Sequence, residues 1–149
     1  MSKKKRQTKR RKRSSRAAGT STGFQILTTI VVGSGNTISD PTPLVCIPGA
    51  CVVWLVRNQD IVAHDVSIDP ADFKRKDNGN REHPFPKKDV LTVHVDPDDY
   101  GLLITSIKKG AKNAGYKYSV RSSNGNGTTN VLDPDLEVVD PGSGDGLVG

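Results

Sequence analysis

The imidazole and thiol groups of this sequence that could hold a metal ion belong to three histidines and two cysteines, and His64 has the most suggestive position among them. Residues 63–68 alternate between polar and apolar side chains, and His64 shares the apolar face with Val66. A histidine that points into a core is either a metal ligand or a residue whose ring nitrogens are hydrogen-bonded within the fold. We interpret His64 as a residue at the edge of the core that is hydrogen-bonded to a backbone group, and we keep a metal site shared with His83 or His94 as the alternative.

Cys46 and Cys51 flank a Pro-Gly turn at residues 48–49. Such a turn would place the two thiols across a hairpin, where they could form a disulfide in an oxidising compartment or stay reduced inside a cell. We favour two small buried thiols. A zinc site needs about four ligands at suitable spacing, and the sequence has no second pair of cysteines.

Short segments rich in β-branched and aromatic residues lie between turn residues, and they predict an all-β fold. Seven or eight strands of this length are typical of a β-sandwich or a small barrel. One helical turn near residues 69–76 is compatible with Pro70 at a first helical position. The segments expected as strands are residues 24–32, 44–46, 51–57, 63–68, 90–95, 102–107, 116–121 and 136–139.

Two segments together resemble the cupredoxin family. Residues 53–66, with the sequence VWLVRNQDIVAHDV, resemble the family's apolar strand with a Trp, which is followed by an Asn, a short turn and a His. Residues 115–120, GYKYSV, together with residues 136–139, resemble the family's penultimate aromatic strand and its last strand. The resemblance covers most of residues 24–140, and it implies a Greek-key β-sandwich.

The same resemblance indicates what a copper site would require. A type 1 copper site takes two imidazoles, one thiolate and usually a weak axial thioether. In the family, the first His comes from the first segment, where His64 aligns with it, and the other ligands come from the second segment. The thiolate position corresponds to Val120, and no Cys, His or Met follows it. The resemblance therefore implies a cupredoxin-like domain without type 1 copper, and we expect no cofactor.

The beginning of the chain is strongly basic. Ten of the 22 Lys and Arg lie within residues 1–16, which contain no acidic residue, so residues 17–149 carry 12 basic against 16 acidic residues and a net charge of −4. We expect residues 1–22 to form a disordered basic arm, residues 23–140 to form one sandwich domain, and residues 141–149 to form a flexible tail. The ten cations are Lys3, Lys4, Lys5, Arg6, Lys9, Arg10, Arg11, Lys12, Arg13 and Arg16.

A flexible arm rich in Lys and Arg binds phosphate chains through counterion release, with little sequence preference. No aromatic side chain lies between the cations, so stacking on single-stranded bases is not indicated. We predict that residues 3–16 bind nucleic acid or another polyanion, with attraction to anionic lipids as the alternative.

The sequence lacks the P-loop, G-x-S-x-G, H-E-x-x-H and dinucleotide-binding motifs, and we predict that the chain is not an enzyme. It has no apolar run of transmembrane length and no clear signal peptide, so we expect a cytoplasmic protein, with export as the alternative. The leading prediction is a non-enzymatic, cupredoxin-like interaction module whose basic arm binds nucleic acid or another polyanion. Two alternatives stay open, namely a His-based copper-binding protein and a small viral-type coat protein with a genome-binding arm.

Overall fold

The computed structural model describes residues 25–39, 43–125 and 129–141, and nearly all of their regular structure is β. The predicted arm, residues 1–22, lies outside the described residues, and so does the predicted tail apart from Pro141. No helix in the described part of the chain has the length and the apolar sequence to cross a membrane. The elements are β1 (Gln25–Gly33), η3 (Ser34–Asn36, a 3-10 helix), β2 (Thr37–Ile38), β3 (Leu44–Cys46), β4 (Cys51–Asn58), β5 (His64–Ile68), η4 (Pro70–Asp72, a 3-10 helix), β6 (Lys74–Arg75), β7 (Leu91–Val95), β8 (Tyr100–Ser106), β9 (Ala114–Lys117), β10 (Val120–Asn124), β11 (Thr129–Leu132) and β12 (Asp135–Val138).

The predicted all-β sandwich is confirmed, but the predicted number of seven or eight strands is wrong, because the described residues form twelve. Two of the additional strands, β2 and β6, contain only two residues each. The strand expected at residues 116–121 divides into β9 and β10, because the backbone N–H of Tyr118 leaves the ladder and donates to the carbonyl oxygen of Pro134. β11 is largely exposed and lacks the apolar alternation that marks a strand in a sequence.

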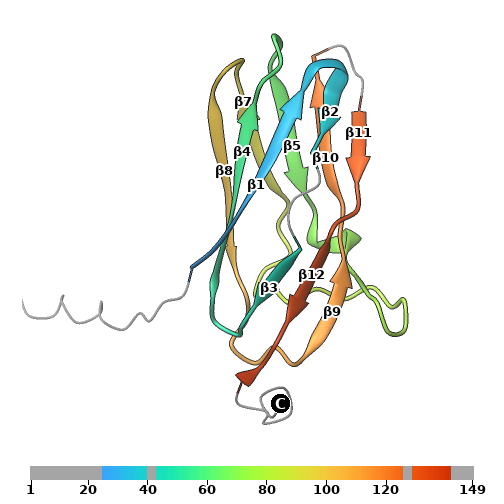
Figure 1. Ribbon diagram of the computed structural model, residues 1–149. Coiled ribbons are helices and arrows are strands. Elements are labelled where there is room, and N and C mark those ends of the chain that lie inside the picture. Colours follow the sequence, from blue (N-terminus) through green and yellow to red (C-terminus); the bar gives the residue numbers. More distant parts are fainter. Residues whose placement is uncertain (1–24, 40–42, 126–128, 142–149) are drawn as a thin grey trace, which may run out of the picture.

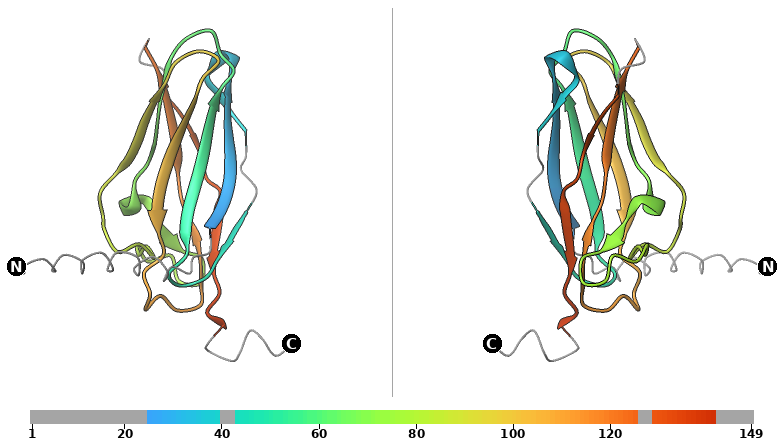
Figure 2. Two further views of the ribbon diagram at one scale, coloured as in Figure 1. Left: turned by 90° about the vertical axis from the view of Figure 1, so that its left-hand side faces the viewer. Right: turned by 90° about the vertical axis from the view of Figure 1, so that its right-hand side faces the viewer.

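The strands form two layers that face each other across the core (Figure 1; Figure 2). One layer is the sheet β2-β1-β4-β8, in which β1 and β4 run parallel and β4 and β8 run antiparallel. The other layer contains the sheet β11-β10-β5-β7 and, towards the lower end in Figure 1, the sheet β3-β12-β9-β6. Residues 59–63 connect β4 to β5, and they carry the chain from the first layer to the second at the upper end of the sandwich.

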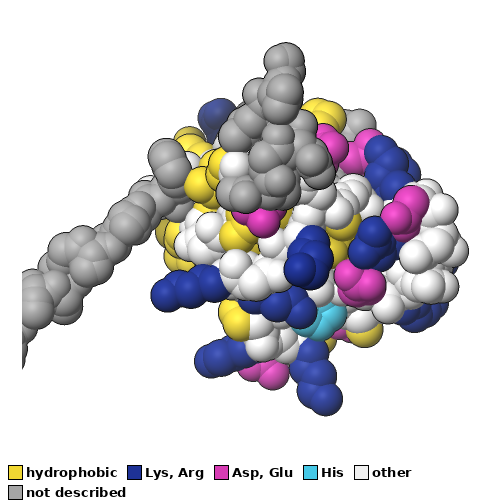
Figure 3. Space-filling view, turned by 90° about the horizontal axis from the view of Figure 1, so that it is seen from below, with side chains coloured by type: hydrophobic (Ala, Val, Ile, Leu, Met, Phe, Trp, Pro, Cys, Tyr) yellow, Lys and Arg dark blue, Asp and Glu magenta, His cyan; other side chains and the backbone are white. Residues whose placement is uncertain are grey.

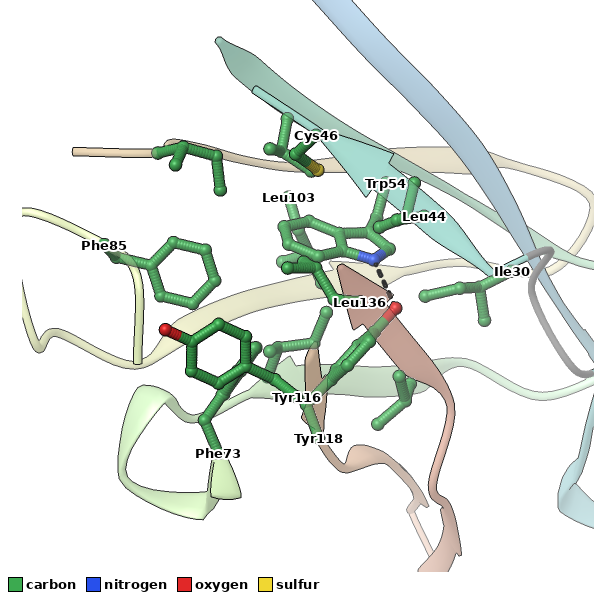
Figure 4. Packing of buried hydrophobic residues seen from close by; sticks show 14 of the residues in the cluster. Ile30, Leu44, Cys46, Trp54, Phe73, Phe85, Leu103, Tyr116, Tyr118 and Leu136 are labelled. Carbon is green, nitrogen blue, oxygen red and sulfur yellow. Dashed lines mark hydrogen bonds between the residues drawn. The ribbon is translucent and has the colours of Figure 1, made fainter. Parts of the chain in front are cut away.

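The core is built from residues that alternate along the strands. β4 buries Val52, Trp54 and Val56 completely, because every second residue of a strand points to the same face. Figure 4 shows the aromatic part of this core, where Nε1 of Trp54 donates to Oη of Tyr118 at 3.0 Å. Phe73 stacks on the ring of Tyr118 with the ring centres 5.0 Å apart. Aromatic pairs of this kind add about 0.5–1.5 kcal/mol each to the stabilisation from burial, so they hold the two layers together.

The outer face of β1, β4 and β8 is apolar. The strand register places Leu27 of β1 beside Val53 of β4, and Val53 beside Ile104 of β8. Leu27 is 64% exposed, and Ile104 and Leu102 are each 51% exposed. Figure 3 shows hydrophobic side chains along the side of the molecule on which these strands lie. A contiguous exposed apolar surface of this kind is a common sign of an interaction site.

Candidate functional site

Four buried polar side chains gather at the upper end of the sandwich, where β4 ends and β5 begins. They are Asn58, Asp60, His64 and Ser122, and we call them the His64 cluster. Asn58 continues the inward alternation of β4, His64 is the inward first residue of β5, and Ser122 points inward from β10. Each is less than a tenth exposed. Polar groups at such depth are stable only when hydrogen bonds replace their contacts with water.

Both ring nitrogens of His64 have partners inside the protein. Nε2 lies 2.8 Å from Oδ2 of Asp60, and Nδ1 lies 3.1 Å from Oγ of Ser122. An ionised carboxylate only accepts hydrogen bonds, so Nε2 carries a proton and donates to Asp60, while Nδ1 shares a hydrogen bond with the serine hydroxyl. The hydrogen bond from His64 holds the pKa of the Asp60 carboxyl below its usual range, and a bond from the backbone N–H of Ile61 lowers it further.

Asn58 ties the connection between the two layers to its surroundings. Its Nδ2 donates to the carbonyl oxygen of Val62 at 2.8 Å and to that of Val95 at 2.9 Å. Its Oδ1 accepts from the backbone N–H of Asp60 at 2.8 Å. A single side chain therefore satisfies three backbone groups and closes residues 59–63 over the end of the core.

The His64 cluster contains the three side-chain types of a Ser-His-Asp relay, in which histidine takes the proton of a serine nucleophile. Ser122 has none of its surface exposed, so a substrate cannot reach its Oγ in this conformation. The arrangement joins β4, β5 and β10 through hydrogen bonds, and it presents no accessible nucleophile among these four residues.

The structure does not bring the three histidines together. Nδ1 of His94 lies 2.6 Å from Oδ1 of Asp65 on the outer face, and this hydrogen bond is the main reason that the pKa of His94 is raised. His83 lies at the opposite, lower end of the sandwich, where its ring stacks on Phe85. Among the residues that the structure describes, no group of three or more His, Cys, Asp or Glu side chains is placed to hold a metal ion.

The side chain that β10 presents to His64 is Ser122, which lies two positions beyond Val120. Val120 is fully buried but pairs with Ile68 at the far end of β5, whereas Ser122 pairs with Val66. The sequence did not lead us to Asn58, Asp60 or Ser122 as partners of His64. Two signals were present in it, since Asp60 and His64 lie four residues apart around a turn, and Ser122 continues the inward alternation of Val120.

Cys46 and Cys51 are both free thiols, but the expectation that both are buried holds only for Cys46, because Cys51 is partly exposed. Cys46 ends β3 and is completely buried, and burial raises the pKa of its thiol to about 12. Such a thiol carries almost no thiolate at neutral pH, and the thiolate is the form that reacts and binds metals. Cys46 is therefore part of the core packing.

The ten cations predicted to bind a polyanion, from Lys3 to Arg16, lie outside the described residues. Their role stays a prediction.

Comparison with known proteins gives a likeness of fold. No protein-family model and no curated protein matches the chain. Among solved structures, the chain is similar to the E. coli chaperone DraB, with a TM-score of 0.50 and 12% identity over 80% of this chain and 59% of that chain. It is also similar to a multi-copper oxidase from Pseudomonas thermotolerans (TM-score 0.34, 13% identity, 80% of this chain and 29% of that chain). A further match is Lac15 from a marine microbial metagenome (TM-score 0.36, 13% identity, 78% of this chain and 32% of that chain). The chain thus spans less than two thirds of each of these proteins.

The matched structures correct one prediction from the sequence. We expected that the chain is not an enzyme, yet the folds that it matches include multi-copper oxidases, which are enzymes. The exclusion of an enzyme is therefore wrong. At such TM-scores these matches transfer no activity, substrate or copper ion to this chain.

Proposed function

We propose that this protein binds nucleic acid, or a comparable polyanion, through its basic N-terminal residues, and that the cupredoxin-like sandwich is the stable domain that carries them. The observation behind the proposal is the charge asymmetry, with ten cations and no acid in residues 1–16 against a net charge of −4 in the remainder. A segment of this charge density neutralises phosphates along a duplex and releases their counterions.

The experiment is a titration of a labelled DNA duplex with the full-length protein, followed by fluorescence anisotropy at several salt concentrations. If about five of the ten cations contact phosphates, the plot of log K against log salt concentration has a slope of about −4.5. A full-length variant in which Gln replaces the ten cations should lose most of this slope and most of the affinity at about 0.1 M salt, with an unchanged melting temperature.

The matched control is a variant that carries residues 1–16 in scrambled order. Counterion release depends on charge and not on sequence, so this control should bind as the wild type does. Equal affinity of the Gln variant and the wild type would overturn the proposal.

The second part of the proposal is that the sandwich functions without type 1 copper. This is supported by the two ring nitrogens of His64, which are both engaged within the protein, and by the serine that β10 presents to that ring. Metal analysis of the purified protein and of a His64→Ala variant tests it. Stoichiometric copper in the wild type that is lost from the variant would show a His-based metal site instead.

A second candidate function, a small coat protein, is favoured by the apolar outer face of β1, β4 and β8. Arg57 is the one charged residue that these strands direct outwards, and its guanidinium lies over the ring of Tyr100, 5.6 Å from the ring centre. The occupant that fits is a second copy of the chain, since two such faces are alike and nearly uncharged. Each copy exposes on the order of 500 Å² there, so a face-to-face pair would bury about 1,000 Å², the lower limit for a specific interface.

Sedimentation of the wild type beside two variants of equal charge tests this second function. Leu102→Lys/Ile104→Lys places two charges on the apolar face, and Thr92→Lys/Thr129→Lys places two charges on exposed strand positions of the other layer. Dimers or particles that are lost only in the first variant support self-assembly. A wild type that is monomeric at all protein concentrations excludes it.

A further inference from the structure

Five exposed lysines lie at the lower end of the sandwich, in residues 83–90 and 107–113. The backbone N–H of Lys108 donates to the carbonyl oxygen of Pro84 at 2.8 Å, which joins the two segments. Figure 3 views the molecule from below and shows Lys and Arg side chains spread over this end. The five residues are Lys87, Lys88, Lys108, Lys109 and Lys112, and we call them the lysine end.

The lysines of the lysine end differ from neighbouring cations in their ion pairing. None of its five ammonium groups forms an ion pair with a carboxylate of the described residues, although neighbouring cations do. Lys76 and Lys117 both contact Asp135, at 3.3 and 2.9 Å, and Arg75 contacts Asp77 at 2.7 Å. A domain that is acidic as a whole therefore keeps one strongly positive end.

Part of the lysine end borders an open hollow of about 460 Å³. Lys87, Lys88, Lys108 and His83 line it, and Asp89 is the one carboxylate among the described residues that line it. Burial lowers the pKa of His83, and the charge of Lys108 lowers it further. Nδ1 of His83 accepts a backbone N–H at 3.2 Å, so Nε2–H of the neutral ring is a donor. Ammonium and imidazole N–H groups around one hollow are suitable donors for phosphate oxygens.

The lysine end also lies where β1 begins. Gln25 pairs with Cys51, and Cys51 pairs with Ser106, which precedes Lys108 by two residues. Adjacent strands are about 4.8 Å apart, so Gln25 and Ser106 lie about 10 Å from each other. The chain from Arg16 to Gln25 spans at most about 30 Å when extended. That length is close to one turn of a duplex, so the basic arm and the lysine end can contact the same turn.

We propose that the lysine end is a second phosphate-binding surface, which holds the backbone of the same duplex that the basic arm binds. The inference rests on the proposed function, and it adds an orientation in which the lower end of the sandwich faces the nucleic acid. Residues 83–90 and 107–113 expose no Phe, Tyr or Trp side chain, so this surface suits backbone phosphates better than unstacked bases. Binding without sequence preference follows from such contacts.

The test compares two full-length variants with the same change of net charge, using the duplex titration described above. Lys108→Gln/Lys109→Gln acts at the lysine end, and Arg57→Gln/Arg121→Gln removes two cations elsewhere. If both lysines contact phosphates, the magnitude of the salt slope falls by about 1.8, and the affinity at 0.1 M salt falls about 60-fold. If only one of the two lysines contacts a phosphate, the magnitude of the slope falls by about 0.9 and the affinity falls about 8-fold. The arginine variant should keep the wild-type slope.

Equal losses in the two variants would show that only net charge matters, and would overturn the inference. No loss in the lysine variant would overturn it as well. If the variant in which Gln replaces the ten cations of the arm loses binding while the lysine variant does not, the proposed function stands and this inference is wrong. If that Gln variant of the arm binds the duplex as the wild type does, the proposed function itself is wrong.

Vesicles with and without phosphatidylserine distinguish a membrane from a nucleic acid. Vesicle binding that requires Lys108 and Lys109, together with no duplex binding, would assign this surface to a membrane and overturn the inference. Duplex binding at salt concentrations at which the vesicles are released supports it.

Discussion

The two ends of the sandwich carry charge in opposite ways. At the upper end, Asp60 is buried and bonded to His64, and Asp65 is bonded to His94. The turn from β7 to β8 adds three further acids at the same end, and its backbone is hydrogen-bonded to Asn58. At the lower end, the five lysines of the lysine end stand in solvent without carboxylate partners among the described residues.

This difference implies that the upper end contributes to the stability of the fold, whereas the lower end contributes to ligand binding. Buried polar groups cost free energy when a partner is removed, because water cannot replace the lost hydrogen bond. Exposed charges add little to stability, but they create the field that steers and holds a charged ligand. The upper end should therefore respond to mutation in unfolding experiments, and the lower end in binding experiments.

The largest expected effect on stability is that of Asn58→Ala. This substitution removes three hydrogen bonds to backbone groups, and it leaves the buried N–H of Asp60 without its acceptor. We expect the free energy of unfolding to fall by about 3–5 kcal/mol. Urea denaturation measures the loss. The control is Gln59→Ala at the exposed neighbour, which should change stability by less than about 0.5 kcal/mol. Similar losses in both variants would show that Asn58 has no special role in stability.

The next expected effect appears on acidification. The pKa of Asp60 is lowered in the folded state, and an unfolded Asp titrates near pH 4. The stabilisation from Asp60 is therefore fully present above about pH 4, and it is lost as the pH falls through the folded-state pKa. The difference in unfolding free energy between the wild type and Asp60→Asn should be constant above about pH 5 and should narrow below about pH 4. A difference that stays the same down to pH 2 would contradict the assignment.

A smaller effect is expected from Ser122→Ala. The substitution removes the hydrogen bond between Oγ of Ser122 and Nδ1 of His64, and it leaves that buried ring nitrogen without this partner. We expect a loss of about 1 kcal/mol in the free energy of unfolding. Ser123→Ala on the same strand, with its more exposed side chain, is the control. An unchanged stability of the Ser122 variant would show that the ring finds another partner.

The smallest effect on stability is expected at the lower end. Lys108→Gln/Lys109→Gln breaks no ion pair within the described residues, so the melting curve should match that of the wild type to within about 0.5 kcal/mol. Calorimetry of the variant used for duplex binding provides the measurement. A clear destabilisation would mean that the lysines support the fold, and it would weaken the contrast between the two ends.

Alternation along a strand predicted much of the fold. In residues 63–68 it identified His64 as a buried residue, which the structure shows. The expected backbone partner of His64 is wrong, because its ring nitrogens contact the side chains of Asp60 and Ser122. Strands of two residues, such as β2, are too short for any periodicity and were missed.

The partners of His64 could not be found by the same reasoning. Alternation gives the face of a residue, and it places Val120 and Ser122 on the same face. Which of them meets His64 depends on the register of two strands whose residues lie 58 positions apart in the chain. The lysine end escaped prediction for a similar reason, because two irregular segments meet there through one backbone hydrogen bond, that of Lys108 to Pro84.

The pairing of β3 with β12 has a consequence for how the protein is made. Leu44 of β3 pairs in parallel with Leu136 of β12, which is 92 residues later in the chain. A ribosome that adds about 5–20 residues per second needs about 5–20 seconds to synthesise that interval. Throughout this time β3 lacks its ladder partner, and Leu44 lacks the cover that it has in the finished core. The sandwich therefore cannot close before β12 has been synthesised, and a chain halted before β12 would leave this edge open to chaperones or to aggregation.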